Sequence, residues 1–292
     1  MNRFEGILQS TDQLDLDELA ALAQRYESLG YRSIWLPDFF GRELVALSSF
    51  ILSKTERLRV TTGIANIYAR DAMSQAQAAH TLNEIYGGRF NLGLGVSHPI
   101  GAQMRGQIWE NPVEKMTNYL QLLRETRANL PEPFDTSPIY IASHGPKMLK
   151  VAAEYADGAN TYLMPPDHTT QARKILGGDK TLTVTLPCCL TSDQNLARTI
   201  GRKALSIYMP LGAYQRAWNT WGYGDELDGG GSDRFIDAMV AWGNSQSISE
   251  RIGEYLDAGA DQVIMIPYNP DGGFEPPWDL LEAFSPQEGS NG

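Results

Sequence analysis

The chain has 292 residues and a formal net charge of -11, and it contains no run of Lys and Arg side chains. Because binding of nucleic-acid phosphates needs clustered cations, this composition argues against a nucleic-acid partner. A hydrophobic content of 42% supports a sizeable core and excludes a disordered chain.

The first residues, MNRFEGILQSTDQLD, lack the basic and long apolar regions of a signal peptide. No stretch approaches the ~18 apolar residues that span a bilayer. Cys188 and Cys189 are adjacent and form no disulfide framework. We therefore expect a cytoplasmic, soluble protein without a membrane partner.

Short apolar runs alternate with helical patterns along the whole chain. Amphipathic segments, several of them closed by a glycine, predict helices over 16–28, 43–53, 72–86, 113–129, 146–155, 193–206, 233–242 and 248–258. The last of these is preceded by a capping box formed by Ser247 and Glu250. Apolar runs predict strands at 4–9, within 27–38, at 60–67, within 84–97, at 138–143, within 154–166, at 182–190 and within 256–270.

Eight apolar strands separated by helices indicate an α/β fold with a parallel sheet covered on both faces. We predict a single (β/α)8 TIM barrel over residues 1–292, with an open doubly wound sheet as the structural alternative. The aromatic-rich segment 208–232 is an insertion that serves as a lid or a partner surface, or else forms a packed helix with its own small core. Residues 285–292 are expected to form a flexible tail.

Polar residues follow the predicted strands, at the end where barrels carry their chemistry. Asp38 follows the second strand, Asn66 and Tyr68 the third, and Ser97 and His98 the fourth. Asp38 can serve as a catalytic carboxylate or cap the next helix. The glycines in GLGVS (93–97) either admit a flat or phosphorylated ligand to the backbone or relieve crowding.

The fifth strand leads into SHGPK (143–147), where a helix begins. Gly145 permits a turn, Pro146 suits the first helical position, and Lys147 lies nearby. The free N–H groups and the Ser143 hydroxyl predict an anion site, and a well-capped ordinary loop is the alternative. The sequence has no H-E-x-x-H or C-x-x-C motif, so no dedicated metal site is expected.

Five segments carry a resemblance to one family. They are GYRSIWLPD (30–38), TTGIANIYARDAMSQAQAAHTLNEIYGGRFNLGLGVSHP (61–99), ASHGPKMLKVAAEYADGANTYLMPP (142–166), GGGSDRFIDAMVAWG (229–243) and AGADQVIMIP (258–267). On these segments the chain resembles the bacterial-luciferase-like oxidoreductase superfamily. Within it, the chain is most similar to the branch that uses the deazaflavin coenzyme F420.

The resemblance implies a (β/α)8 barrel with the tricyclic ring in its mouth and with backbone amides on the phosphate. Asp38 then lies beside the ring, and the bond Gly63–Ile64 matches a non-prolyl cis peptide behind it. Asn66 and Tyr68 line the ring or the substrate. The remaining cofactor contacts implied are Gly95, Val96, Ser97, Ser143, His144, Gly145, Pro146 and Lys147.

Two positions depart from the family pattern. Alcohol-oxidising relatives have a His where this chain has Phe39, and a Glu where it has His98. His98 is therefore the candidate proton donor or acceptor, helped by Asp38 or Tyr68, unless it only hydrogen-bonds the cofactor.

These observations predict an F420-dependent oxidoreductase that moves hydride between the coenzyme and a small organic substrate. One alternative is an FMN-dependent luciferase-like monooxygenase that uses O2. A non-catalytic flavin-binding barrel is the other. The resemblance also implies a homodimer.

Overall fold

The computed structural model describes residues 6–131 and 137–286. The chain divides into two compact units, residues 6–160 and residues 161–292 together with 1–5, and each is described by itself. The start of the first predicted strand, at residue 4, and positions 287–292 of the predicted tail lie outside the described residues.

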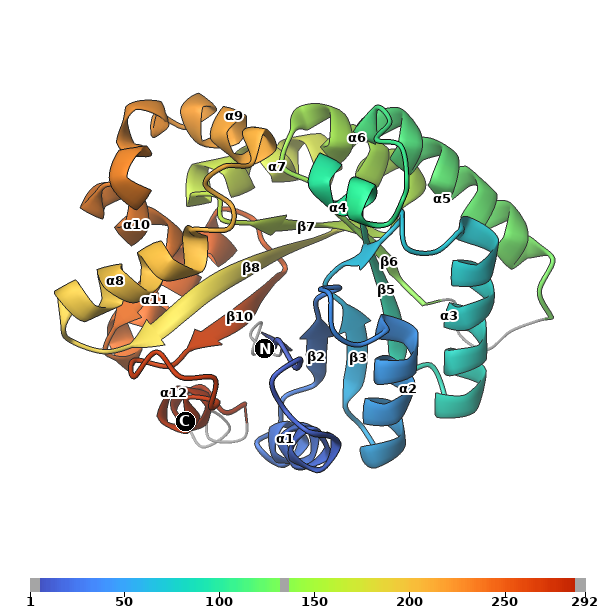
Figure 1. Ribbon diagram of the computed structural model, residues 1–292, viewed down its shortest axis with the longest axis horizontal. Coiled ribbons are helices and arrows are strands. Elements are labelled where there is room, and N and C mark those ends of the chain that lie inside the picture. The colour runs from blue at the N-terminus through green and yellow to red at the C-terminus, as the bar shows by residue number, and fades with distance from the viewer. Residues whose placement is uncertain (1–5, 132–136, 287–292) are drawn as a thin grey trace. The chain divides into compact units, whose positions relative to one another are not determined.

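The unit formed by residues 6–160 is built on a parallel sheet (Figure 1). The strands pair in the order β1-β2-β3-β5-β6-β7, and β4 pairs with β5. Their bounds are β1 Gly6–Leu8, β2 Ser33–Leu36, β3 Arg59–Thr62, β4 Ala65–Asn66, β5 Phe90–Gly95, β6 Ile139–Ala142 and β7 Gly158–Tyr162. All residues of β5 are buried, as expected for a central parallel strand covered on both faces.

Helices follow these strands. Each packs against the next in the order α1, α2, α3, α5 and α6. They are α1 Leu16–Ser28, α2 Leu44–Lys54, α3 Ala72–Tyr86, α4 Pro99–Met104, α5 Pro112–Ala128 and α6 Pro146–Tyr155. Figure 1 shows α2 and α3 beside β3 and β5, which they contact. Helix α1 begins at a capping box of Asp15 and Glu18, and α3 ends at the left-handed Gly87.

In the second unit, β9 and β10 both pair in parallel with β8. The strands are β8 Thr181–Leu190, β9 Ala241–Gly243 and β10 Gln262–Tyr268. The helices are α7 Pro166–Leu176, α8 Gln194–Leu205, α9 Gly212–Thr220, α10 Asp233–Met239, α11 Ser245–Asp257 and α12 Trp278–Ala283, with short 3-10 turns at Gly224–Glu226 and Asp228–Gly230.

The aromatic segment 208–232 contributes α9 to the core of this unit. Trp218 is fully buried, and its indole N–H donates to the Leu163 carbonyl at 2.9 Å. Tyr214 and Tyr223 belong to the same buried cluster, together with Phe235 of α10. The segment is therefore packed as a helix that shares the unit's core, and a lid function stays a prediction.

The structure corrects four local expectations. The helix expected over 233–242 ends at Met239, because residues 241–243 pair with β8 as strand β9. The cap of α11 is Asn244, whose side chain accepts from the Ser247 N–H, so Ser247 lies inside the helix. Helices α4, α7 and α12 were not expected, and the run 60–67 is divided into β3 and β4.

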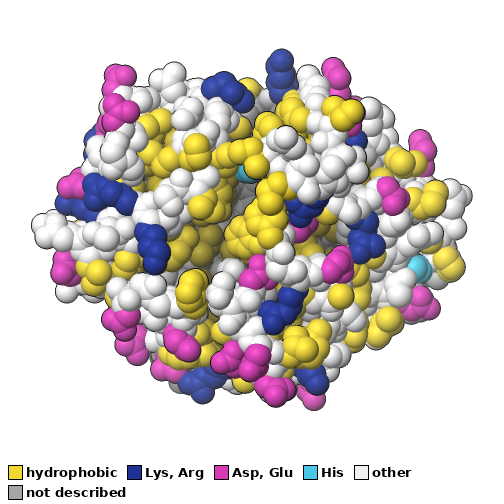
Figure 2. Space-filling model, viewed as in Figure 1, with side chains coloured by type: hydrophobic (Ala, Val, Ile, Leu, Met, Phe, Trp, Pro, Cys, Tyr) yellow, Lys and Arg dark blue, Asp and Glu magenta, His cyan; other side chains and the backbone are white. Residues whose placement is uncertain are grey.

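Lys and Arg side chains are scattered over the face drawn in Figure 2 and form no continuous basic area there. Among residues 6–131 and 137–286, no helix combines the length and apolar character needed to cross a membrane.

Candidate functional site

Three predicted site residues of the 6–160 unit lie at the carboxyl ends of neighbouring strands. Asp38 follows β2, Asn66 ends β4, and His98 follows β5. Since these strands are parallel, their carboxyl ends lie at one edge of the sheet. The Asp38 Oδ2 atom accepts a hydrogen bond from the Asn66 backbone N–H at 3.0 Å.

The other Asp38 oxygen contacts a residue that the sequence did not predict. Arg105, at the end of α4, donates from Nη2 to Asp38 Oδ1 at 3.1 Å and from Nη1 to the Gly101 carbonyl at 3.4 Å. Burial raises the pKa of the Asp38 carboxyl, although the Asn66 N–H and the Arg105 charge act in the opposite direction. Asp38 thus connects β2, β4 and α4 through a single carboxylate.

His98 is the half-buried N-cap residue of α4, and its carbonyl accepts from the Ala102 N–H at 3.1 Å. Burial lowers the pKa of the imidazole below its ordinary value of 6.5, so the neutral form predominates at pH 7. The preceding residue, Ser97, has a left-handed backbone with φ 61°, which is uncommon for a side chain other than glycine. A Cβ on Gly101 would lie 2.5 Å from the Ser97 hydroxyl, so a larger residue there would displace the Ser97 side chain.

The peptide bond Gly63–Ile64 is cis, at the position that the resemblance implied. The glycines of β5 face this segment. A Cβ on Gly93 would lie 1.9 Å from the Thr62 carbonyl oxygen, and one on Gly95 would lie 2.4 Å from Ile64 Cδ1. Of the two explanations for these glycines, the structure therefore supports relief of crowding against the neighbouring strand. Val96, which follows, is half-buried.

The side chains of Asn66 and Tyr68 have local partners. Asn66 Oδ1 accepts from the Tyr68 backbone N–H at 2.9 Å. The Tyr68 hydroxyl accepts from the Glu110 N–H at 3.0 Å, and its buried ring stacks on Trp109 with centroids 5.5 Å apart. Tyr68 thus anchors the connection between α4 and α5, and its catalytic role stays a prediction.

The predicted anion loop follows β6, which pairs with β5. Ser143 is fully buried, and its hydroxyl donates to the Ile141 carbonyl at 3.3 Å rather than to the helix. The half-buried His144 follows, and α6 then begins at Gly145 with no side-chain cap, with Pro146 and Lys147 exposed. No atom lies within 4 Å of a Cβ added at Gly145. The uncapped N–H groups and the exposed ammonium are donors that fit a phosphate.

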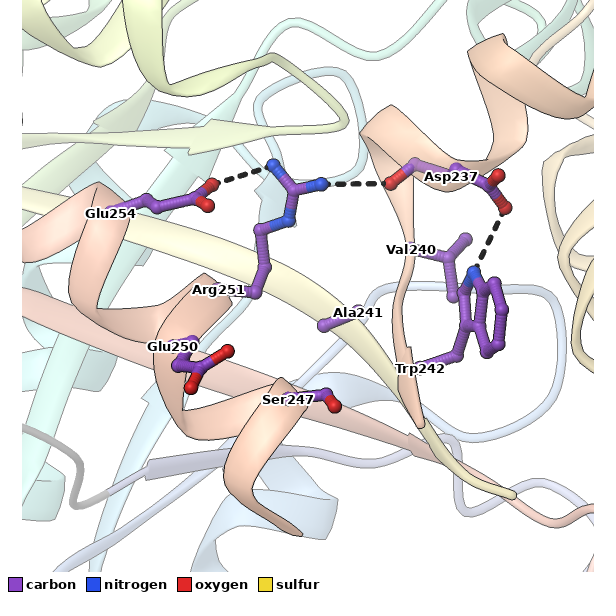
Figure 3. Close-up of a pocket in the computed structure, with 8 residues that line it drawn as sticks. All are labelled: Asp237, Val240, Ala241, Trp242, Ser247, Glu250, Arg251 and Glu254. Atoms are coloured by element: carbon purple, nitrogen blue, oxygen red, sulfur yellow. Dashed lines mark hydrogen bonds and ion pairs between the residues drawn. The ribbon is translucent and has the colours of Figure 1, made fainter. Parts of the chain in front are cut away.

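A pocket of about 250 Å³ lies in the second unit and contains none of the predicted site residues. Figure 3 shows Arg251 between Glu254, which it contacts at 2.7 Å, and the Asp237 carbonyl. The Trp242 indole N–H also donates to Asp237. The central charges of this pocket are therefore satisfied within it. Among the described residues, no group of His, Cys, Asp and Glu side chains is arranged to hold a metal ion.

The fold and the site define an α/β enzyme whose candidate residues follow the carboxyl ends of parallel strands. A model of the luciferase-like monooxygenase family matches residues 3–262, and the chain belongs to this family. The protein is thus a luciferase-like oxidoreductase.

Three relatives illustrate the likeness. A 5,10-methylenetetrahydromethanopterin reductase of Methanolobus tindarius is 24% identical over 290 residues, covering 85% of this chain and 89% of the relative. The structure of an F420-dependent secondary alcohol dehydrogenase with an F420-acetone adduct superposes with a TM-score of 0.78 at 16% identity, covering 98% of both chains. A coenzyme F420 dependent tetrahydromethanopterin reductase from Methanopyrus kandleri gives a TM-score of 0.73 at 16% identity, again covering 98% of both chains. These likenesses show the predicted fold, a (β/α)8 barrel of the luciferase-like type.

Proposed function

We propose that this protein is an F420-dependent oxidoreductase that transfers hydride between the deazaflavin and a small organic substrate. The observation that carries the proposal is the Asp38 carboxylate, which the Asn66 N–H and Arg105 hold at the strand ends beside α4 and its cap His98. The names of two structural relatives, both dependent on F420, agree with this assignment.

When bound, the deazaflavin supplies a two-electron hydride donor or acceptor. The chain supplies the proton chemistry. Neutral His98 accepts the hydroxyl proton when an alcohol is oxidised and returns it to the oxygen when a carbonyl is reduced. Asp38, desolvated and held at two oxygens, stabilises positive charge that develops nearby.

The start of α6 is the proposed phosphate site. Its first N–H groups have no side-chain acceptor, unlike those of α1 and α3, which Asp15 and Asp71 cap. A phosphate there accepts from these groups and gains from the helix dipole, and Lys147 adds one charge. We therefore assign the coenzyme's phosphate to the backbone N–H groups of Gly145 and Lys147 and to the Lys147 ammonium; Pro146, between them, has no N–H and fixes the first turn of the helix.

The test is a titration of the purified protein with F420 and with FMN, followed by fluorescence. We expect micromolar or tighter binding of F420 and weaker binding of FMN. Lys147→Ala should weaken F420 binding several-fold, whereas Lys150→Ala, one turn further along α6, serves as the matched control. Tighter binding of FMN than of F420 contradicts the proposal.

The family's description as luciferase-like monooxygenase favours a second candidate, an FMN-dependent monooxygenase. Uptake of O2 that depends on reduced FMN, with no response to F420, would establish it. Tight binding of either coenzyme without turnover over a broad substrate panel would instead support a non-catalytic flavin-binding protein. The substrate remains a small molecule in both enzymatic candidates, and we propose a homodimer, which sedimentation tests.

A further inference from the structure

Exposed apolar side chains gather in two segments that follow β2 and β5. Of the twelve large apolar side chains that are exposed in the described part of the chain, five lie there. We call these five the apolar rim: Phe39 (38% exposed), Phe40 (70%), Ile100 (63%), Met104 (63%) and Ile108 (84%). Single exposed apolar residues are ordinary, but such a concentration beside a candidate site indicates a binding surface.

Arg105 joins the two segments of the rim to each other and to the site. Its guanidinium contacts Asp38 at 3.1 Å and lies over the Phe40 ring at 5.9 Å from the centroid. It also follows directly after Met104 in α4. The rim therefore borders the carboxylate that we assign to the active site.

The exposure of Phe40 does not reflect a loosely held segment. Two residues further on, the Arg42 guanidinium donates to the Thr11 and Leu14 carbonyls, at 2.5 Å each. A Cβ on Gly41 would lie 2.3 Å from an Asp12 carboxylate oxygen. The chain is thus fixed on both sides of Phe40, with Asp38 on one side and Arg42 on the other.

Ile108 is held outward in the same way. Its neighbour Trp109 stacks on the buried Tyr68 ring, and the next N–H, of Glu110, donates to the Tyr68 hydroxyl. Both anchors lie directly after Ile108 and hold the backbone on that side, while the Ile108 side chain is 84% exposed. Apolar side chains fixed in an exposed position are preorganised for binding.

We propose that the apolar rim binds the non-reacting part of the substrate, and this assignment rests on the proposed function. The substrate is then an uncharged organic compound with an alkyl or aromatic body and one carbonyl or hydroxyl group directed toward Asp38 and His98. The cations that border the rim already have partners: Arg105 contacts Asp38 and Lys115 contacts Glu110, and the Arg42 guanidinium donates to two backbone carbonyls. A charged substrate would have to compete with these partners.

The experiment measures the binding of 2-alkanones, from 2-butanone to 2-decanone, to the coenzyme-free protein. Trp109, half-buried beside Ile108, provides the fluorescence signal, and Trp109→Phe identifies its share. Each added methylene that contacts the rim should tighten binding about two- to fourfold. In the double variant Ile108→Ser with Met104→Gln, the ratio of affinities per added methylene should fall toward one, which means no gain. Both positions are exposed, so the variant should still fold.

The matched control is Met73→Gln combined with Ile85→Ser on α3, where both residues are also exposed. It should leave the affinity ratio per methylene unchanged. The proposal is overturned if the affinity ratio per methylene is one in the unmodified protein. It is also overturned if the two double variants reduce that ratio equally. A dimer that becomes monomeric when Ile108 and Met104 are replaced overturns it as well, because the rim is then an interface between copies. The F420 titration of the same proteins is independent of these outcomes, so failure of the proposed function is recognised separately.

Discussion

Burial makes the ionised form of the Asp38 carboxyl less favourable in the folded protein than in the unfolded chain. Its pKa is raised by burial, so the folded state binds this proton more tightly than the unfolded state does. The contribution of Asp38 to stability therefore falls as pH rises through the range between its ordinary and its raised pKa. A cost of this kind is typical of functional groups.

Replacement of Asp38 by Asn should remove this cost while the amide oxygen still accepts from the Asn66 N–H. We expect Asp38→Asn to unfold at higher urea concentration than the unmodified protein at pH 7, and the difference to vanish near pH 4. Activity should fall. Loss of stability at pH 7 would show that the ion pair with Arg105 outweighs desolvation.

Asp71 is a control whose carboxyl pKa is shifted in the opposite direction, downward. It caps α3 by accepting from the Ser74 N–H and hydroxyl, and these bonds lower the pKa of its carboxyl. Asp71 therefore stabilises the folded protein at pH values above 3.8, the ordinary Asp pKa. This contribution is lost as pH falls through the lowered pKa. Asp71→Ala should cost about 0.5–2 kcal/mol at pH 7 and less at low pH.

His98 determines a second pH effect, this time on the rate. Because burial lowers the pKa of the imidazole, the acid limb of kcat/KM for substrate oxidation should lie below pH 6.5, the ordinary imidazole value. His98→Gln should lower the rate about 10²–10⁴-fold and remove this limb, with F420 affinity unchanged. Turnover equal to that of the unmodified enzyme would exclude His98 as the proton carrier.

At the scale of the element, strand β5 depends on glycine for close approach to its neighbour. The Cβ of Gly93→Ala would meet the Thr62 carbonyl at 1.9 Å, so we expect a loss of about 1–3 kcal/mol in urea unfolding. Gly145→Ala adds a methyl group where nothing lies within 4 Å, and its stability should change little. Equal stabilities of the two variants would contradict this account of β5.

Local signals were sufficient for three helices, α1, α3 and α6, but not for the start of α11, whose cap is Asn244 and not Ser247. The predicted bounds of α1, α3 and α6 agree with the structure, because Asp15, Asp71 with Gly87, and Gly145 with Pro146 mark their ends in the sequence. Strand β9 was missed because three residues carry no periodic signal of their own. Its extended conformation depends on pairing with β8, about 50 residues earlier in the chain.

The same distinction applies to the site. The placement of Asp38, Asn66 and His98 at one edge of the sheet was predictable, because parallel strands bring their carboxyl ends together. Arg105 was not, because its partner Asp38 is 67 positions away and nothing around Arg105 in the sequence differs from an ordinary helix end. The burial of the Ser143 hydroxyl and the anchoring of Tyr68 by Glu110 likewise depend on long-range packing.

At the scale of the whole molecule, the alternation of apolar strands and helices was enough to predict the (β/α)8 class. Family membership came from longer motifs, which the match over residues 3–262 confirms. The choice of coenzyme rests on fewer residues than the fold class or the family membership does. It is therefore best tested by a property of the entire chain.

Ligands that bind only the folded protein raise its unfolding free energy by mass action. At a hundredfold excess over its Kd, F420 should add about 2.7 kcal/mol to the apparent stability measured by denaturant. A deazaflavin that lacks the phosphate should add less at the same concentration, because the uncapped start of α6 then has no anion to bind. Lys147→Ala should reduce the difference in added stability between F420 and the phosphate-free deazaflavin. Lys150→Ala should leave that difference unchanged. Greater stabilisation by FMN than by F420 at equal concentration would assign the chain to the flavin-dependent members of its family instead.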